Sequence, residues 1–438
     1  MIRFVGFVIF LIPTLVLGNL AEELEKKYAN LLDPLVEEGM LPSYFLSVSD
    51  RNGLIFDRGL GTSGAIIEKD PTSQTPFALL SLSKPIVALA VLKLLERENV
   101  SLDTSVSKYL PEFEDARVCG ESASVTDIKI VDLFRHTSGL GNNLEFSGAR
   151  SNQMRSAGCT RELAQLYQDQ ALMTFSTVLG PNTKNTSLED QVEKLSSLPL
   201  LFKAGHDFQY SLSTDVLGRI AEVLSKESLD VFLKDLLFEP LGMKNTGFYV
   251  DEEDRYRRAT LMKPLIRTFP VPGTYQRFEK YPFRQFEVAG IGDKVNVVSA
   301  GMGLVSTGED MTKFANFILR ELSLHDGSVF LPASMSDLIF ENQLPSILGE
   351  NPLKGKLPRA SGDGMSLVFN IRAKDRRYRE VFERKDVDFF YWSGFSSSVF
   401  WVDTVTGVSG VFLSQIRPTQ NYLIGDLDRI ADSLIMAK

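Results

Sequence analysis

The sequence predicts a mixed α/β protein in which a mostly helical part interrupts a part built from strands and helices. Three observations support this class. Helix and strand patterns fill the first 80 residues, helical patterns dominate from 81 to about 250, and strand patterns return beyond 295. We expect the strands near the two ends of the chain to pair in one sheet, with the helical part inserted between them. The expected boundaries are 19–80 and 290–438 for the strand-containing part and 81–289 for the helical part.

The patterns in residues 19–80 predict a helix and then two strands. Apolar residues recur at helical spacing from Ala21 to Gly39. The turn at Asp50–Gly53 contains Asn-Gly, a strong hairpin signal, and joins the predicted strands Tyr44–Val48 and Leu54–Phe56.

The inserted part begins with a helix near Ser81, followed by loops at Gly139–Gly141 and Gly180–Asn182 and a long periodic helix at Ser213–Leu237. Beyond 295 a glycine-rich loop leads to further elements. These are a helix at Met311–Arg320, strands at Ser366–Arg372, Asp388–Trp392, Val399–Val402 and Gly410–Leu413, and a final helix at Ile424–Met436.

Composition excludes several classes of protein. The chain has 438 residues, of which 44% are hydrophobic and 24% charged, close to globular averages, which argues against disordered, collagen-like and polytopic membrane proteins. At about 150 residues per domain, the length allows two or three domain-sized units. The net charge is −9 and the pI about 5.2. We expect no nucleic-acid partner, because binding to phosphates requires a basic face.

The first 18 residues have the pattern of a secretory signal peptide. Arg3 precedes an uncharged run from Phe4 to Leu17, Gly18 stands at the expected cleavage point, and polar residues follow from Asn19. The run is shorter than the roughly 20 residues of a membrane span. We expect a cleaved signal at 1–18 and a secreted mature chain, 19–438. A membrane association is expected only if the segment is retained as an anchor.

Secretion allows two kinds of modification. The sequons at Asn99 and Asn185 are candidate glycosylation sites. The two cysteines, Cys119 and Cys159, are expected to form one disulfide, with two buried free thiols as the alternative.

Ser81 and Lys84 form the strongest chemical motif in the sequence. They precede the apolar run Ile86–Leu92, which predicts a buried helix beginning close to Ser81. Residues three apart share a helix face. A serine hydroxyl needs a base to become a nucleophile, and a desolvated lysine can supply one. The same pattern at Ser105 and Lys108 has no buried helix behind it, so we interpret that copy as a surface turn.

Metal and cofactor chemistry is not indicated. The three histidines, His136, His206 and His325, lie far apart, and the chain has neither a zinc-binding pattern nor a Gly-x-Ser-x-Gly elbow. We therefore expect no metal and no cofactor.

Six motifs occur in an order that resembles the serine β-lactamase-related family, especially its class C and esterase branch with their penicillin-binding relatives. They are Ser81–Pro111, Leu133–Leu140, Phe208–Ser211, Glu239–Phe248, Gly301–Asp310 and Tyr391–Gly394. The resemblance spans nearly all of residues 25 to 430. It implies a β-lactamase/transpeptidase-like α+β fold, with an antiparallel sheet flanked by helices and a mostly helical subdomain.

The resemblance also implies roles for individual residues. Ser81 would be acylated, Lys84 would assist proton transfer, and Tyr210 would act as the base. The oxyanion would be held by the backbone N–H groups of Ser81 and Phe395. His136 matches a structural histidine of the family.

Two positions depart from the family pattern, and both would face the substrate. Leu212 stands where the tyrosine box usually has Asn, and it cannot hydrogen-bond a substrate amide or fix Lys84. Trp392, Ser393 and Gly394 stand where the third box usually begins with Lys or His. Without that cation, carboxylate-bearing β-lactams and peptides are disfavoured. Uncharged esters or amides with apolar groups are favoured, because Trp392 offers an apolar face and one N–H donor.

These observations predict a secreted serine hydrolase that acts through an acyl-enzyme on a small-molecule or peptide-like ester or amide. It would be more esterase-like than β-lactamase-like. A catalytically silent binding protein that keeps the fold is the alternative. A penicillin-binding or β-lactamase activity is a narrower third option.

Overall fold

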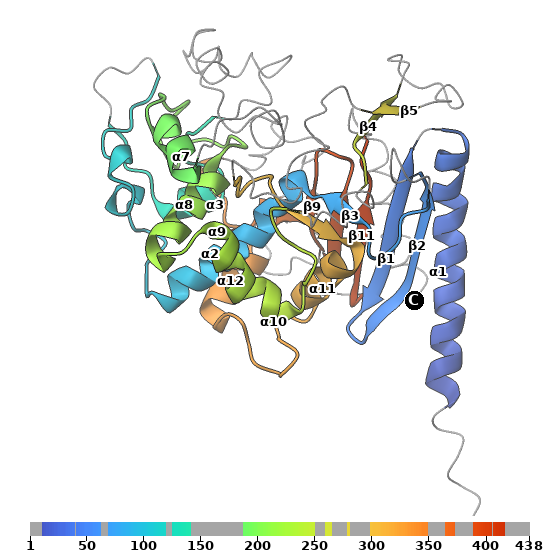
Figure 1. The fold of residues 1–438 in the computed structure, drawn as a ribbon. Coiled ribbons are helices and arrows are strands. Elements are labelled where there is room, and N and C mark those ends of the chain that lie inside the picture. Colours follow the sequence, from blue (N-terminus) through green and yellow to red (C-terminus); the bar gives the residue numbers. More distant parts are fainter. Residues whose placement is uncertain are drawn as a thin grey trace, which may run out of the picture.

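A seven-stranded antiparallel sheet forms one side of the molecule (Figure 1). The computed structural model describes residues 11–39, 41–62, 69–119, 125–141, 187–249, 259–264, 278–280, 298–348, 364–372, 389–404 and 406–416. The strands follow one another across the sheet in the order β2 (Gly53–Gly61), β1 (Ser43–Asp50), β11 (Val408–Leu413), β10 (Val399–Asp403), β9 (Phe389–Ser393), β8 (Asn370–Arg372), β7 (Gly364–Met365). Every neighbouring pair is antiparallel. The pairing of β1 with β11 confirms that strands from the two ends of the chain share one sheet.

Strand β1 is buried on both faces because its side chains alternate between two cores. Tyr44, Leu46 and Val48 pack in a cluster that includes residues of helix α1 (Leu11–Glu37). Phe45 belongs to the larger cluster on the other face, where helix α11 (Gly308–Leu319) approaches so closely that a Cβ on Gly308 would lie 2.1 Å from the Phe45 ring. The sheet therefore lies between α1 and α11.

Helix α1 is tied to the sheet by a polar cluster at its C-terminal half. The Tyr44 hydroxyl donates to Asp33 at 2.6 Å, and Arg58 of β2 pairs with both Asp33 and Glu25. The helix continues without a break across the expected cleavage point at residue 18. In the part of the chain that the structure describes, no helix is long and apolar enough to cross a membrane.

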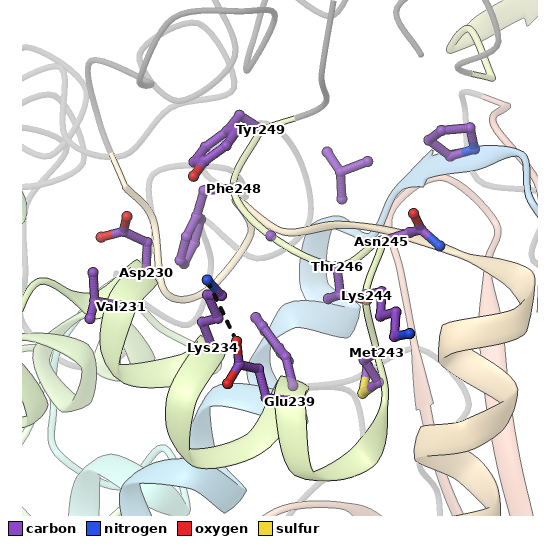
Figure 2. Close-up of a pocket in the computed structure, with 14 residues that line it drawn as sticks. Asp230, Val231, Lys234, Glu239, Met243, Lys244, Asn245, Thr246, Phe248 and Tyr249 are labelled. Carbon is purple, nitrogen blue, oxygen red and sulfur yellow. Dashed lines mark ion pairs between the residues drawn. The ribbon is translucent and has the colours of Figure 1, made fainter. Parts of the chain in front are cut away.

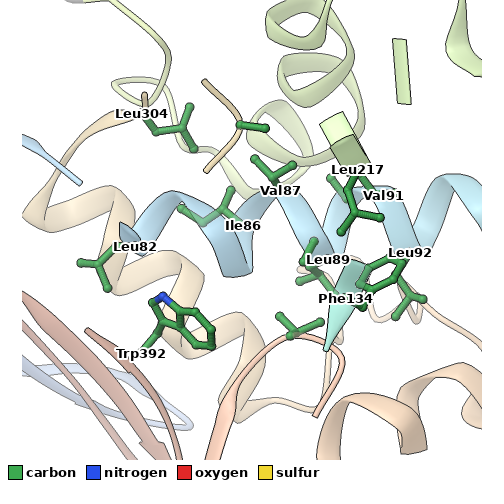
Figure 3. Packing of buried hydrophobic residues seen from close by; sticks show 14 of the residues in the cluster. Leu82, Ile86, Val87, Leu89, Val91, Leu92, Phe134, Leu217, Leu304 and Trp392 are labelled. Atoms are coloured by element: carbon green, nitrogen blue, oxygen red, sulfur yellow. The ribbon is translucent and has the colours of Figure 1, made fainter. Parts of the chain in front are cut away.

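The helical part is organised around α8 (Ser213–Ser225). Among the described helices, its main contacts are with α2 (Ser83–Arg97), α3 (Ile130–Phe134), α7 (Leu188–Ser196) and α9 (Leu229–Leu233). Helix α2 is buried from Ser83 to Leu92, as its apolar sequence predicts, and Figure 3 shows Val87 and Val91 on the side of α2 that faces Leu217 of α8. A 3₁₀ turn, η1 (Leu80–Leu82), leads directly into α2.

Two predicted elements are divided in the structure. The helix expected at Ser213–Leu237 stops at Lys226, whose left-handed backbone (φ 61°) ends α8 before α9 begins. A π-helical turn (Lys234–Phe238) and α10 (Glu239–Leu241) follow α9. The strand expected at Ser366–Arg372 is a tight hairpin of β7 and β8, because the Ser366 hydroxyl accepts bonds from the backbone N–H groups of Val368 and Phe369.

Several short elements were not predicted from the sequence. They are β3 (Pro76–Ala78) paired with β6 (Val305–Thr307), β4 (Met262–Pro264) paired with β5 (Phe278–Lys280), α12 (Ala333–Phe340), and the 3₁₀ turns at Val106–Lys108, Pro111–Phe113 and Ser346–Leu348. The first of these turns contains Lys108, so the second Ser-x-x-Lys copy is a turn, as predicted. The loop at Gly180–Asn182 and the helix at Ile424–Met436 lie outside the described residues.

The expected disulfide is not supported. Cys119 is a free thiol that is half-buried against the main hydrophobic cluster, and its backbone N–H donates to Leu200. Its thiol therefore packs as a small apolar group. Cys159 lies outside the described residues, as does the sequon asparagine Asn185. Asn99 is exposed in the turn after α2.

Candidate active site

Ser81 lies at the N-terminal approach to α2, in a turn with unusual backbone geometry. Leu80, the residue before it, has φ 51°, a region that costs a non-glycine residue free energy. Ser81 is half-buried, whereas Lys84 is only 5% exposed. Among the described residues, the backbone N–H of Ser81 has no hydrogen-bond partner. The turn thus leaves a serine hydroxyl and a backbone donor near the surface, next to a buried lysine.

Lys84 is held by groups from two distant segments. Its amino group donates to the carbonyl oxygen of Gly301 at 2.8 Å. It also lies 4.9 Å from the centre of the Tyr210 ring, within the range of a cation–π contact. The structure therefore brings Lys84 and Tyr210 together, as the motifs imply.

The loop before β6, which contains Gly301 and Leu304, is bonded to the same turn. Leu79 donates its backbone N–H to Leu304 O at 2.9 Å, and Leu304 donates to the Ser83 hydroxyl at 3.1 Å. These bonds hold Gly301 next to Lys84, because the loop between Gly301 and Leu304 is short.

Tyr210 is half-buried between two other rings. The ring centres of Tyr210 and His136 lie 4.8 Å apart, and those of Tyr210 and Trp392 lie 6.2 Å apart. His136 accepts the backbone N–H of Ser211 at its Nδ1 atom. Burial, and then the nearby Lys84, lower the pKa of His136 to about 3, so the imidazole is neutral at physiological pH. His136 therefore acts as a structural support for Tyr210.

The third box contributes the turn between β9 and β10. Gly394 donates to Ser398 O at 2.7 Å, and Ser397 has φ 68°. A Cβ on Gly394 would lie 3.0 Å from Leu79 O, so this turn abuts the backbone next to Ser81. Phe395 follows Gly394 and is half-buried at the same edge.

Two of the predicted pocket residues are too deeply buried to line an open pocket. Leu212 is 2% exposed and Trp392 is 3% exposed, and both belong to the main hydrophobic core. Figure 3 shows the Trp392 ring beside Leu82. Ser393 is half-buried. Leu212 and Trp392 thus form the apolar backing of the site.

The sequence profile of the Beta-lactamase family matches residues 28–435. The chain belongs to this family. In this chain, Lys84, Tyr210 and the β9–β10 turn lie together next to Ser81.

Among its relatives, the chain is 28% identical to esterase EstB of Burkholderia gladioli over 334 residues, covering 74% of this chain and 76% of that protein. Solved structures of the same fold include EstCE1, described as a hydrolase with promiscuous acyltransferase activity. It is 21% identical with a TM-score of 0.66, covering 94% of this chain and 97% of that one. Unliganded simvastatin synthase LovD of Aspergillus terreus is 18% identical with a TM-score of 0.66, covering 96% and 98% of the two chains.

Asp215 is a site residue that the motif comparison missed. It is 1% exposed on α8 and accepts hydrogen bonds from the Ser299 hydroxyl at 2.8 Å and the Gly301 N–H at 3.2 Å. Asp215 falls one helical turn after Leu212, on the buried face of a predicted helix. An acidic residue at such a position is a signal that the sequence did contain.

A separate pocket of about 630 Å³ lies beside α9 and α10 (Figure 2). Lys234, Glu239, Phe248 and Tyr249 are among its lining residues, and Lys234 pairs with Glu239 at 3.6 Å. None of the predicted catalytic residues lines it. Among the described residues, no group of three or more His, Cys, Asp or Glu side chains is placed to hold a metal.

Gly301→Ala should disturb the site directly. The new Cβ would lie 2.9 Å from Asp215 Oδ2 and 3.1 Å from Lys84 Nζ, so at least one of these groups must move. Because a displacement of about 1 Å can cost about 100-fold in rate, we expect fluorophosphonate labelling of Ser81, followed by intact mass, to slow by about 10- to 100-fold. Gly247→Ala is the control, since its Cβ would meet nothing closer than 3.9 Å. Equal labelling rates in both variants would contradict this role of Gly301.

Neutral His136 should make the protein sensitive to acid. The unfolded state takes up a proton near pH 6.5, whereas the folded state resists it down to about pH 3. The stabilisation is therefore complete above pH 6.5 and declines as the pH falls, by at most about 1.4 kcal/mol per pH unit. In His136→Asn, urea unfolding between about pH 7 and pH 5 should give a shallower slope of unfolding free energy against pH. Asn tolerates the positive φ of 56° at this position. Exposed His206→Asn should keep the wild-type slope, and the prediction is wrong if His136→Asn keeps it as well.

Proposed function

We propose that the protein is a serine esterase that acts through an acyl-enzyme at Ser81. The observation that carries this proposal is the position of Lys84, which is packed between Gly301 O and the Tyr210 ring one helical turn after a half-buried serine. The Burkholderia relative is named an esterase, which supports the same reaction class. So does the description of EstCE1 as a hydrolase.

The proposed reaction uses groups from each of the three site segments. Ser81 Oγ attacks the carbonyl carbon of the ester while its proton passes to the Tyr210–Lys84 pair. The backbone N–H groups of Ser81 and Phe395 stabilise the negative oxygen of the tetrahedral intermediate. The bond to the alcohol oxygen then breaks, and the alcohol leaves with the transferred proton. Water attacks the acyl-enzyme by the same route and releases the acid.

The apolar backing of the site favours uncharged substrates. Trp392 occupies the position from which a lysine or histidine would pair with a substrate carboxylate. Trp392 and Leu212 both lie in the hydrophobic core behind the site. A carboxylate brought to this position would lose hydration without gaining a cation. We therefore infer a preference for small esters with apolar acyl groups over β-lactams and D-amino acid peptides.

Ser81→Ala should abolish turnover of a p-nitrophenyl ester series, because no other group replaces the nucleophile. Ser105→Ala, in the second Ser-x-x-Lys copy, is the matched control and should retain wild-type turnover. Rates across acyl chain lengths would then define the preferred acyl group.

Other results in this assay would favour other functions. Turnover that persists in Ser81→Ala contradicts the nucleophile assignment. No turnover in the wild type favours the silent binding protein, for which the replacements at Leu212 and Trp392 are the supporting observation. A mass adduct with a β-lactam would favour a penicillin-binding activity.

We also propose that residues 1–18 direct secretion and are then removed. The side chains of α1 that pack on the sheet include Tyr28 and Leu32, which both follow the cleavage point, so the mature fold would keep these contacts. N-terminal sequencing of protein secreted by expressing cells should give Asn19 as the first residue. A chain that keeps its first 18 residues and sediments with membranes would indicate an anchor.

A further inference from the structure

In the family, the tyrosine box usually ends in an asparagine whose side-chain amide can fix the lysine. Lys84 has no such amide beside it. The tyrosine box ends in Leu212, which is buried and apolar. An amino group has two or three N–H donors, depending on protonation, and the described structure gives it one hydrogen-bond acceptor, Gly301 O. Because only 5% of Lys84 is exposed, little water reaches its remaining N–H donors, and a further buried polar group can help to fix its position.

Asp215 is placed one helical turn beyond Leu212 and has an unused oxygen. Its Oδ1 atom accepts from both the Ser299 hydroxyl and the Gly301 N–H. Its Oδ2 atom is buried and has no hydrogen-bond partner in the described structure. An unpaired buried carboxylate oxygen is costly, and such groups are retained where they serve a function.

The unused oxygen lies on the same side of Gly301 as the Lys84 amino group. A Cβ on Gly301 would be 2.9 Å from Asp215 Oδ2 and 3.1 Å from Lys84 Nζ, so these two atoms lie at most 6.0 Å apart. The peptide of Gly301 also joins the two residues, because its N–H donates to Asp215 and its carbonyl accepts from Lys84. Asp215 therefore fixes the acceptor that holds Lys84.

Three titratable side chains surround Lys84 in the described structure, and Asp215 is the acid among them. Tyr210 presents its ring face, and His136 is neutral. The pKa of the Asp215 carboxyl is raised, because the effect of burial exceeds the opposing effects of Lys84 and of the hydrogen bonds from Ser299, Gly301 and Ala300. The carboxyl and the amino group thus interact electrostatically through a buried region.

We infer that Asp215 is a positioning residue that replaces the asparagine of the family's tyrosine box. It anchors Gly301 against Lys84 and places a carboxylate beside the amino group when that group takes up the proton of Ser81. The inference rests on the proposed use of Ser81 as a nucleophile. In that step the Oγ–H bond breaks, the Oγ–acyl bond forms, and the proton moves to the Tyr210–Lys84 pair.

The test is the rate at which a fluorophosphonate labels Ser81, followed by intact mass as a function of pH. Labelling forms an Oγ–P bond and releases fluoride, so it reports nucleophile activation without requiring the natural ester. Asp215→Asn preserves shape and one acceptor but removes the charge. We expect labelling to slow by at least 10-fold, because Gly301 is less firmly anchored, and its pH profile to move to lower pH, because a negative charge beside the reacting groups has been removed. Asp215→Glu should recover part of the rate.

The control is Asp310→Asn. Asp310 is also fully buried, but it accepts from Asn245 and Thr246, away from Lys84. The Asp310→Asn variant should be less stable, but the pH profile of its labelling should be unchanged. Asp215 has no positioning role if Asp215→Asn labels at the wild-type rate and pH profile, or if the two variants lose rate only in proportion to their loss of folded protein. Absence of labelling in the wild type would also overturn the inference. Labelling without ester turnover would refute the esterase proposal and leave the role of Asp215 intact.

Discussion

The buried amino group of Lys84 is the constraint on which the arrangement of the site depends. A lysine in the first turn of an apolar helix is unfavourable, because it loses hydration and opposes the helix dipole. This free-energy cost is offset by groups outside α2, namely the Gly301 carbonyl, the Tyr210 ring and the region of Asp215. The loops that carry these groups must therefore be fixed to the helix.

The fold fixes them by joining its two parts at the start of α2. The loop before β6 bonds to Leu79 and Ser83, and the β9–β10 turn abuts Leu79 from the sheet side. Non-glycine residues with positive φ stand in three of the site segments, at Leu80, His136 and Ser397. Each such conformation costs free energy and persists only where the surroundings impose it. At these three positions the packing of the two parts of the fold therefore holds backbone conformations that are unfavourable on their own.

Most of the fold and one contact of the candidate site could be predicted from the sequence, for different physical reasons. The strands near both ends of the chain and the buried helix at 83–97 follow from strong hydrophobic patterns, which report burial directly. The break at Lys226 and the hairpin at Ser366 were not predicted. A left-handed residue and a serine-capped turn hardly change the hydrophobic pattern. The contact between Lys84 and Tyr210 was implied by ordered motifs. The motifs did not imply a role for Asp215, because that role depends on a contact with Gly301, 86 positions away.

The two departures from the family pattern have a common physical consequence. Leu212 and Trp392 replace groups that would hydrogen-bond or attract a polar substrate, and both side chains are incorporated in the hydrophobic core. Asp215, on the next turn of α8, anchors the Gly301 peptide that holds Lys84, and it does so without presenting an amide to the substrate. In the mechanism that we propose, the residues that move the proton are then separate from the surface that recognises the substrate. In the esterase that we propose, the chemistry of acyl transfer is retained while selectivity moves from charged to apolar groups.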